Sequence, residues 1–168
     1  MNIKFKSKLS SILLSACILL TSATMGMAGD YKALKDVQSV KTVFDFRDGN
    51  PEYALVHIKL LHDTYKDKAI RDVTDKPDFV VVFMAGSVKL LSNNRESFSP
   101  EEIKFLEEMD NVIKAMAIDG IHMEICAFAA NFFTVDLETV SPLISRVDNG
   151  WISSIGYQAK GYTLVPVY

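Results

Sequence analysis

Cys126 is the residue of this chain best suited to chemistry. It ends the alternating run of residues 121–126 and is followed at once by the small and apolar residues 127–130, so the pattern predicts a strand, then a thiol, then a helix start. Backbone N–H groups and the positive dipole at a helix start favour the thiolate, the form that attacks sulfur or carbon. A packed cysteine that behaves as a small apolar residue is an equal interpretation.

Three further residues are expected near the same edge of a sheet, and we assign them as candidate substrate-binding residues. Ligands of open α/β sheets bind at the carboxyl ends of the strands. That edge would gather residues 46–50, 85–87 and 126–131. Asp45 could position a ligand, Gly86 could let backbone approach it closely, and Asn131 lies just after the thiol segment.

Other polar residues are weaker candidates. The sequence places His57 and His62 about 140° apart around one helix and His122 about 13 Å from Cys126 along one strand, so neither a metal site nor a Cys–His pair is expected. Arg47 could hold an anionic sulfur species, although a solvated arginine is the ordinary case, and Asp48 is typical of a turn. No cofactor motif is present: GxGxxG, a phosphate-binding glycine loop and GxSxG are all missing, which leaves a cofactor-dependent reductase unsupported.

The first 28 residues are typical of a secretory signal, with three lysines before an apolar run and small residues ahead of a cleavage after Ala28. A lipoprotein box ending at Cys17 is the alternative. Cleavage would leave 140 of the 168 residues and shift the formal net charge from −3 to about −6, because the segment holds three lysines and no acid. We therefore expect a periplasmic or secreted protein without a membrane span, and its acidity argues against nucleic acid as a partner.

Export implies an oxidising compartment, and one mature cysteine cannot form an intramolecular disulfide. Cys126 is then buried and inert, paired with another chain, or used chemically.

After a loose lead-in at 29–39, strands and helices alternate through one domain, residues 40–168. Strands are expected at 40–46, 78–84, 121–126, 143–147 and 162–167. Helices are expected at 51–66, 99–118 and 150–161, with a short helix directly after Cys126 and a short helical piece at 88–91. This order predicts an α/β fold with three layers, α/β/α, and a mostly parallel sheet of about five strands.

Three segments together suggest a family. They are FDFRDGNPEYAL at 44–55, MEICAFAA at 123–130 and the ending GYTLVPVY at 161–168. In order and spacing they resemble the DsrE/DsrF-like sulfur-trafficking proteins. The resemblance implies a three-layer α/β fold, assembly as a homo-oligomer such as a trimer or hexamer, and relay of sulfur as a cysteine persulfide. Cys126 matches the sulfur-accepting cysteine of that family, and no other site residue is carried over.

Two hypotheses follow for the function. In the first, Cys126 accepts a sulfane sulfur atom as a persulfide and relays it between a donor and an acceptor, either a protein or a small sulfur compound, without a cofactor. In the second, the protein is a non-catalytic oligomeric binding module whose cysteine is structural, with Phe132, Phe133 and Trp151 as its contact residues. The two are distinguished by whether the thiol is accessible in the folded protein.

Overall fold

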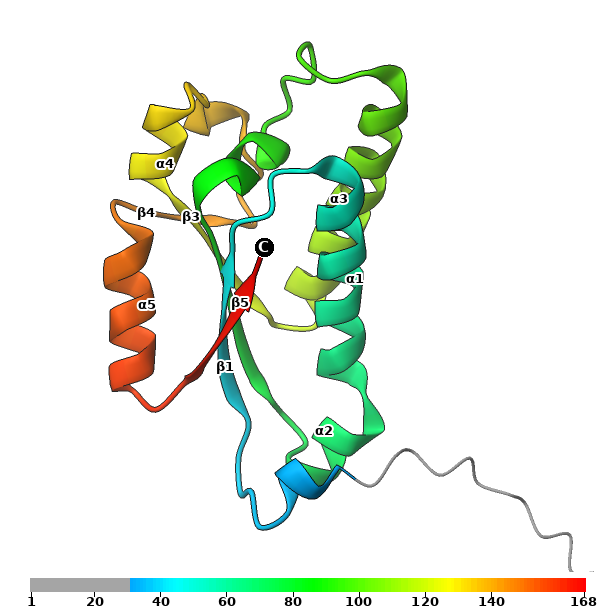
Figure 1. Cartoon of the computed structure of the whole chain (residues 1–168), viewed down its shortest axis with the longest axis vertical. Coiled ribbons are helices and arrows are strands. Elements are labelled where there is room, and N and C mark those ends of the chain that lie inside the picture. The colour runs from blue at the N-terminus through cyan, green and yellow to red at the C-terminus, as the bar shows by residue number, and fades with distance from the viewer. Residues whose placement is uncertain (1–30) are drawn as a thin grey trace, which may run out of the picture.

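The computed structural model describes residues 31–168, so the expected leader, its cleavage site and Cys17 lie outside the described residues. Five parallel strands form one sheet in the order β4-β3-β2-β1-β5, with helices on both faces (Figure 1). The strands are β1 (Lys41–Phe46), β2 (Asp78–Phe83), β3 (His122–Cys126), β4 (Ser145–Val147) and β5 (Thr163–Val167). The predicted three-layer α/β fold with a parallel five-stranded sheet is therefore confirmed.

The helices cover the two faces unequally. Helices α1 (Pro51–Lys66) and α3 (Pro100–Ile118) lie side by side on one face, and α5 (Gly150–Ala159) lies on the other (Figure 1). Each begins at a side chain that caps its free N–H groups: Asn50 accepts from Tyr53, Ser99 forms a capping box, and Asn149 accepts from Trp151. These local signals explain why the starts of α1 and α3 were predictable.

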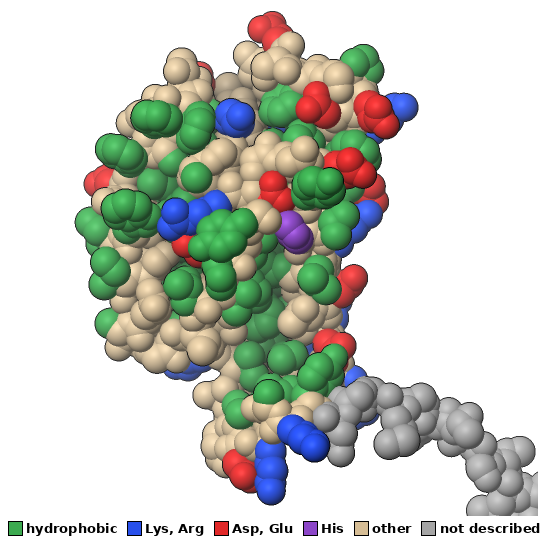
Figure 2. Space-filling model, in the orientation of Figure 1, with side chains coloured by type: hydrophobic (Ala, Val, Ile, Leu, Met, Phe, Trp, Pro, Cys, Tyr) green, Lys and Arg blue, Asp and Glu red, His purple; other side chains and the backbone are tan. Residues whose placement is uncertain are grey.

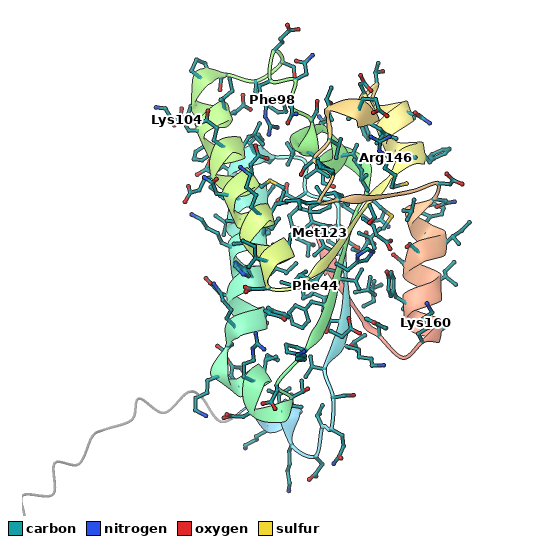
Figure 3. The ribbon with its side chains drawn as sticks, turned by 180° about the vertical axis from the view of Figure 1, so that it is seen from behind. Phe44, Phe98, Lys104, Met123, Arg146 and Lys160 are labelled. Carbon is teal, nitrogen blue, oxygen red and sulfur yellow. The ribbon has the colours of Figure 1, made fainter. Side chains whose placement is uncertain are left out.

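The core lies between the sheet and the pair α1 and α3. Residues 79–83 of β2 are all buried, as expected for a central strand covered on both faces. Figure 3 shows Phe44 and Met123 between the layers, whereas Lys104 and Lys160 project outward from their helices. Within residues 31–168 no helix is both long and apolar enough to cross a bilayer.

One short helix was not expected. The polar stretch 67–77 contains α2 (Lys68–Val73), which starts where Asp67 accepts the N–H of Ala69. The other short elements are η1 (Lys32–Leu34), η2 (Ala85–Leu91), α4 (Ala127–Phe132) and η3 (Leu137–Thr139). A single turn of helix needs few apolar residues, so periodicity gives little warning of such elements.

Strand β5 forms an edge of the sheet. The carbonyl of Val167 accepts the N–H of Arg47 at 2.8 Å, so Val167 faces β1 in the ladder. Its neighbour Pro166 lies opposite Asp45 and, by alternation, directs its nitrogen away from β1. The open side of this strand therefore carries a residue with no N–H to donate.

Candidate functional site

The sheet and helix α4 place Cys126 where the sequence predicted it. Cys126 ends β3 and is the N-cap residue of α4, and it is only 4% exposed. The residue nevertheless lines a cavity of about 440 Å³, the Cys126 pocket. The lining residues are Arg47, Met84, Ala85, Cys126, Phe128, Ala129, Phe132, Phe133, Asn149 and Trp151. Cys126 is thus buried by its neighbours and still lines an open, mostly apolar hollow.

A backbone donor from another helix contacts the sulfur. The N–H of Gly150 donates to Cys126 Sγ at 3.2 Å, and Gly150 is the first residue of the ten-residue helix α5. The positive end of α5 therefore faces the sulfur. The sequence pointed instead to α4, a helix of six residues that makes no side-chain cap hydrogen bond with Cys126.

Gly150 packs closely against the side chains of Met84 and Val82. A Cβ atom on residue 150 would lie 2.6 Å from Met84 Sδ and 3.1 Å from Val82 Cγ1. Both distances are shorter than ordinary van der Waals contact, so a larger residue would force either the Met84 side chain or α5 to shift. Gly150 is a positioning residue that sequence reasoning missed, because its partner lies 24 positions away.

Arg47 is the one charged residue among the described residues that line the Cys126 pocket. Its Nε donates to both carboxylate oxygens of Asp45, at 2.8 and 2.9 Å. This hydrogen bonding raises the pKa of the Arg47 guanidinium. Asp45, a predicted substrate-binding residue, is not part of the pocket wall and acts on it by holding Arg47. Direct contact between Asp45 and a substrate stays a prediction.

Gly86 and Asn131, the other predicted substrate-binding residues, also lie outside the pocket wall. Gly86 packs against Gly49, where a Cβ on Gly49 would come within 3.0 Å of the Gly86 carbonyl carbon. The absence of a side chain at Gly86 thus permits close contact between η2 and the turn that precedes α1. Asn131 is exposed on α4. Ala85, which does line the pocket, has a φ of 51°, a left-handed conformation that non-glycine residues seldom adopt.

Exposed aromatic rings surround the pocket mouth. Phe128, Phe132 and Trp151 are 70%, 74% and 63% exposed. Figure 2 shows hydrophobic side chains gathered on the side of the molecule formed by α4 and α5. Two of these three rings were among the aromatics expected for a binding module; the third expected ring, Phe133, is half-buried and stacks edge-on against Phe132.

The histidines take no part in the pocket. His57 Nδ1 lies 3.0 Å from Asp48 Oδ2, and His62 Nε2 lies 2.6 Å from Asp119 Oδ2. Asp48 also accepts the N–H of Asn50 at 2.9 Å, as expected of a turn residue. Across residues 31–168 no cluster of three or more histidine, cysteine or acidic side chains is arranged to hold a metal ion.

A buried carboxylate on the same strand as Cys126 was not foreseen. Glu124 accepts hydrogen bonds from the hydroxyls of Ser153 and of Tyr157, and it lies 3.0 Å from His122 Nε2. Burial and the bond to Glu124 raise the pKa of Tyr157, while the hydrogen bond to Asp78 raises that of Tyr162 to about 12. The hydrogen bonds from Ser153 and Tyr157 to Glu124 fix α5 against the sheet and so help to hold Gly150 at the sulfur.

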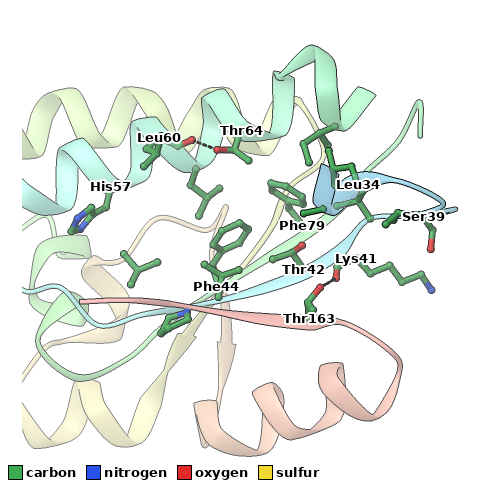
Figure 4. Close-up of a pocket in the computed structure, with 18 of the residues that line it drawn as sticks. Leu34, Ser39, Lys41, Thr42, Phe44, His57, Leu60, Thr64, Phe79 and Thr163 are labelled. Carbon is green, nitrogen blue, oxygen red and sulfur yellow. Dashed lines mark hydrogen bonds between the residues drawn. The ribbon is translucent and has the colours of Figure 1, made fainter. Parts of the chain in front are cut away.

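A second hollow lies on the other face of the sheet. The α1–β5 groove has a volume of about 860 Å³ and is bounded by η1, α1, β1 and β5. Figure 4 shows Phe44, Leu60 and Phe79 around it, with His57 at one end. Cys126 is not among its lining residues, so the groove is separate from the Cys126 pocket.

Comparisons with known proteins show the fold. No family model matches the chain. An uncharacterized protein of Aquifex aeolicus (strain VF5) is 23% identical over 128 residues, which is 76% of this chain and 56% of that protein. The chain thus spans little more than half the length of this relative.

Two solved structures are similar over three quarters of the chain. A protein of unknown function from Methanobacterium thermoautotrophicum, MTH1491, has a TM-score of 0.58 at 13% identity, covering 76% of this chain and 99% of its own. The ychN protein of E. coli has a TM-score of 0.53 at 10% identity, covering 77% and 99%. These similarities support the expected three-layer α/β fold with a parallel five-stranded sheet.

Proposed function

We propose that this protein handles sulfur at Cys126 and belongs functionally with the DsrE/DsrF-like proteins. One observation carries the proposal: Cys126 lines an open pocket, and its Sγ accepts the N–H at the start of α5. The pocket gives a sulfur donor a place to bind beside Cys126, and the backbone N–H of Gly150 lies against its sulfur. The shared fold and the three family-like segments add support.

The chemistry is an exchange of one S–S bond for another. The Cys126 thiolate attacks the terminal sulfur of a donor R–S–SH, the donor's S–S bond breaks, and its electron pair leaves on the R–S⁻ thiolate. Cys126 then holds the sulfur as a persulfide, Cys–S–SH. An acceptor thiolate attacks that terminal sulfur and returns Cys126 to the thiolate, so no oxidant or cofactor is consumed.

The proposal includes the setting of this reaction. Residues 1–28 direct export, with cleavage after Ala28, and the mature chain forms a homo-oligomer that meets its donor or acceptor outside the cytoplasm. Cleavage is checked by the N-terminal residue of the protein recovered from the host cell.

Mass spectrometry tests the reaction. The processed protein is incubated with inorganic polysulfide, and we expect the mass of added sulfur on the peptide that contains Cys126, removable by dithiothreitol. Cys126→Ser should gain none. The proposal fails if the native protein gains no sulfur although iodoacetamide alkylates Cys126 under the same conditions.

The second candidate is a binding module with a structural cysteine, and the low exposure of Cys126, 4%, favours it. A thiol titration separates the two. Sulfur handling requires that Cys126 reacts with a small disulfide reagent in the native protein. Reaction only after denaturation would support the binding module instead.

A further inference from the structure

The Cys126 pocket is far larger than the sulfur that it would receive. A volume of about 440 Å³ lies within the range of cavities that enclose an organic ligand, roughly 300–1,000 Å³. A lone sulfane atom or a short inorganic chain would leave most of this space to water. The size of the cavity therefore indicates that the donor brings an organic body with its sulfur.

The residues that line the Cys126 pocket indicate that the organic part of the donor is apolar. Phe128, Phe132 and Trp151 present their rings in water around the mouth, and Met84 and Ala129 line the interior. Covering these surfaces with another apolar surface is favourable in proportion to the area removed from water. A polar or highly charged body would gain none of this.

The charge of the pocket points the same way. Among the described residues its single charged lining side chain is Arg47, and Asp45 already neutralises it through paired hydrogen bonds. A dianion such as thiosulfate would lose its hydration without meeting a free cation.

We propose that the donor at Cys126 is a small organic hydropersulfide with an apolar body, an inference that rests on the proposed function. The body occupies the aromatic pocket while the terminal sulfur meets Cys126 Sγ. The Cys126 thiolate forms a bond to that terminal sulfur, the S–S bond of the donor breaks, and the apolar thiolate leaves. The new persulfide takes the proton that the terminal sulfur carried.

Rates of sulfur transfer test the inference. Benzyl hydropersulfide is compared with inorganic polysulfide and with glutathione hydropersulfide, whose body is charged. Each rate of Cys126 persulfidation is divided by the rate of the same donor with free cysteine, which removes differences in donor reactivity. We expect the normalised rate with the benzyl donor to be about tenfold higher than with either other donor.

Substitutions locate the preference. Phe128→Ser and Phe132→Ser should each reduce the ratio of the benzyl rate to the polysulfide rate by about threefold to tenfold. Ile118→Ser is the matched control, because Ile118 is 86% exposed and lies outside the pocket, and it should leave the ratio unchanged. The three substituted side chains are exposed, so the variants should fold.

Binding is measured apart from transfer. In Cys126→Ser the sulfur chemistry is removed, and Trp151, the single tryptophan of the chain, reports on the pocket. We expect benzyl methyl disulfide to change its fluorescence with saturation and thiosulfate to have no effect. Equal normalised rates for all donors, or no saturable change, would overturn the inference and leave the proposed function standing. Absence of transfer from every donor would overturn both.

Discussion

Gly150 and Cys126 show how a backbone atom can set the chemistry of a side chain. The sulfur meets an N–H because α5 starts beside the end of β3, and α5 starts there because residue 150 has no side chain to collide with Met84. The hydrogen bonds of Glu124 with Ser153 and Tyr157 hold the same helix from further along. Substitution at any of these positions should therefore change the distance between the Gly150 N–H and Cys126 Sγ.

The first prediction compares two glycines of one helix. Gly150→Ala places a Cβ atom 2.6 Å from Met84 Sδ and should lower the free energy of unfolding by about 1–3 kcal/mol. Gly156→Ala meets nothing within 4 Å and should raise it by up to about 1 kcal/mol. Urea unfolding gives both values. Equal effects of the two substitutions would contradict the close approach at Gly150.

Some residues of the candidate site could be predicted from the sequence and others could not. Cys126 could be located because strand alternation and the small residues after it are local signals. Gly150 could not, because its contact with Cys126 depends on how β3 and the chain after β4 lie in the sheet, and the strand order is not encoded in periodicity. Glu124 was missed because a single acid in an apolar strand gives no sign of the partners that α5 will bring.

Helices in this chain are positioned by their first residues. In α3 the Ser99 side chain accepts the N–H of Glu102, and the Glu102 carboxylate accepts the N–H of Ser99. These bonds lower the pKa of Glu102 below its ordinary 4.5, the bond from the Ser99 backbone being the larger cause. Both hydrogen bonds of this capping box were predictable from the spacing of serine and glutamate. The start of α2 was overlooked because one turn of helix leaves no periodic pattern.

The second prediction concerns this capping box. Ser99→Ala should lower the free energy of unfolding by about 1 kcal/mol, whereas Ser97→Ala, a nearby exposed serine in a turn, should change it little. A lowered pKa means that the Glu102 charge stabilises the folded state above about pH 4.5 and that this contribution disappears as the pH falls. Thermal unfolding between pH 7 and pH 3 measures it. Glu102→Gln should flatten that dependence, and an unchanged profile would count against the box.

At the scale of the whole molecule, apolar side chains are exposed on both faces of the edge strand β5. Leu164 and Val165 of β5 are exposed, and beside them the α1–β5 groove has Leu60 at its rim. Parallel sheets are ordinarily covered on both faces, and large exposed apolar patches of soluble proteins usually mark contact surfaces. This surface suits the homo-oligomer of the proposed function.

The third prediction tests that assembly. Sedimentation velocity of the processed protein should show a species at least twice the mass of one chain, because association through the uncovered groove would remove apolar surface from water. Leu60→Glu places a charge in the groove and should shift the population to the single chain. Ile118→Glu, an exposed apolar position outside the groove, should not. A wild-type protein that sediments as a single chain would refute the expected assembly.

Pro166 limits how such copies can join. With its nitrogen directed away from β1, the open margin of β5 lacks one donor that an incoming strand would need. Copies can then associate through side chains but are hindered from extending the sheet into a continuous ribbon. A protein with this much uncovered hydrocarbon is thereby given some protection against amyloid-like growth at high local concentration.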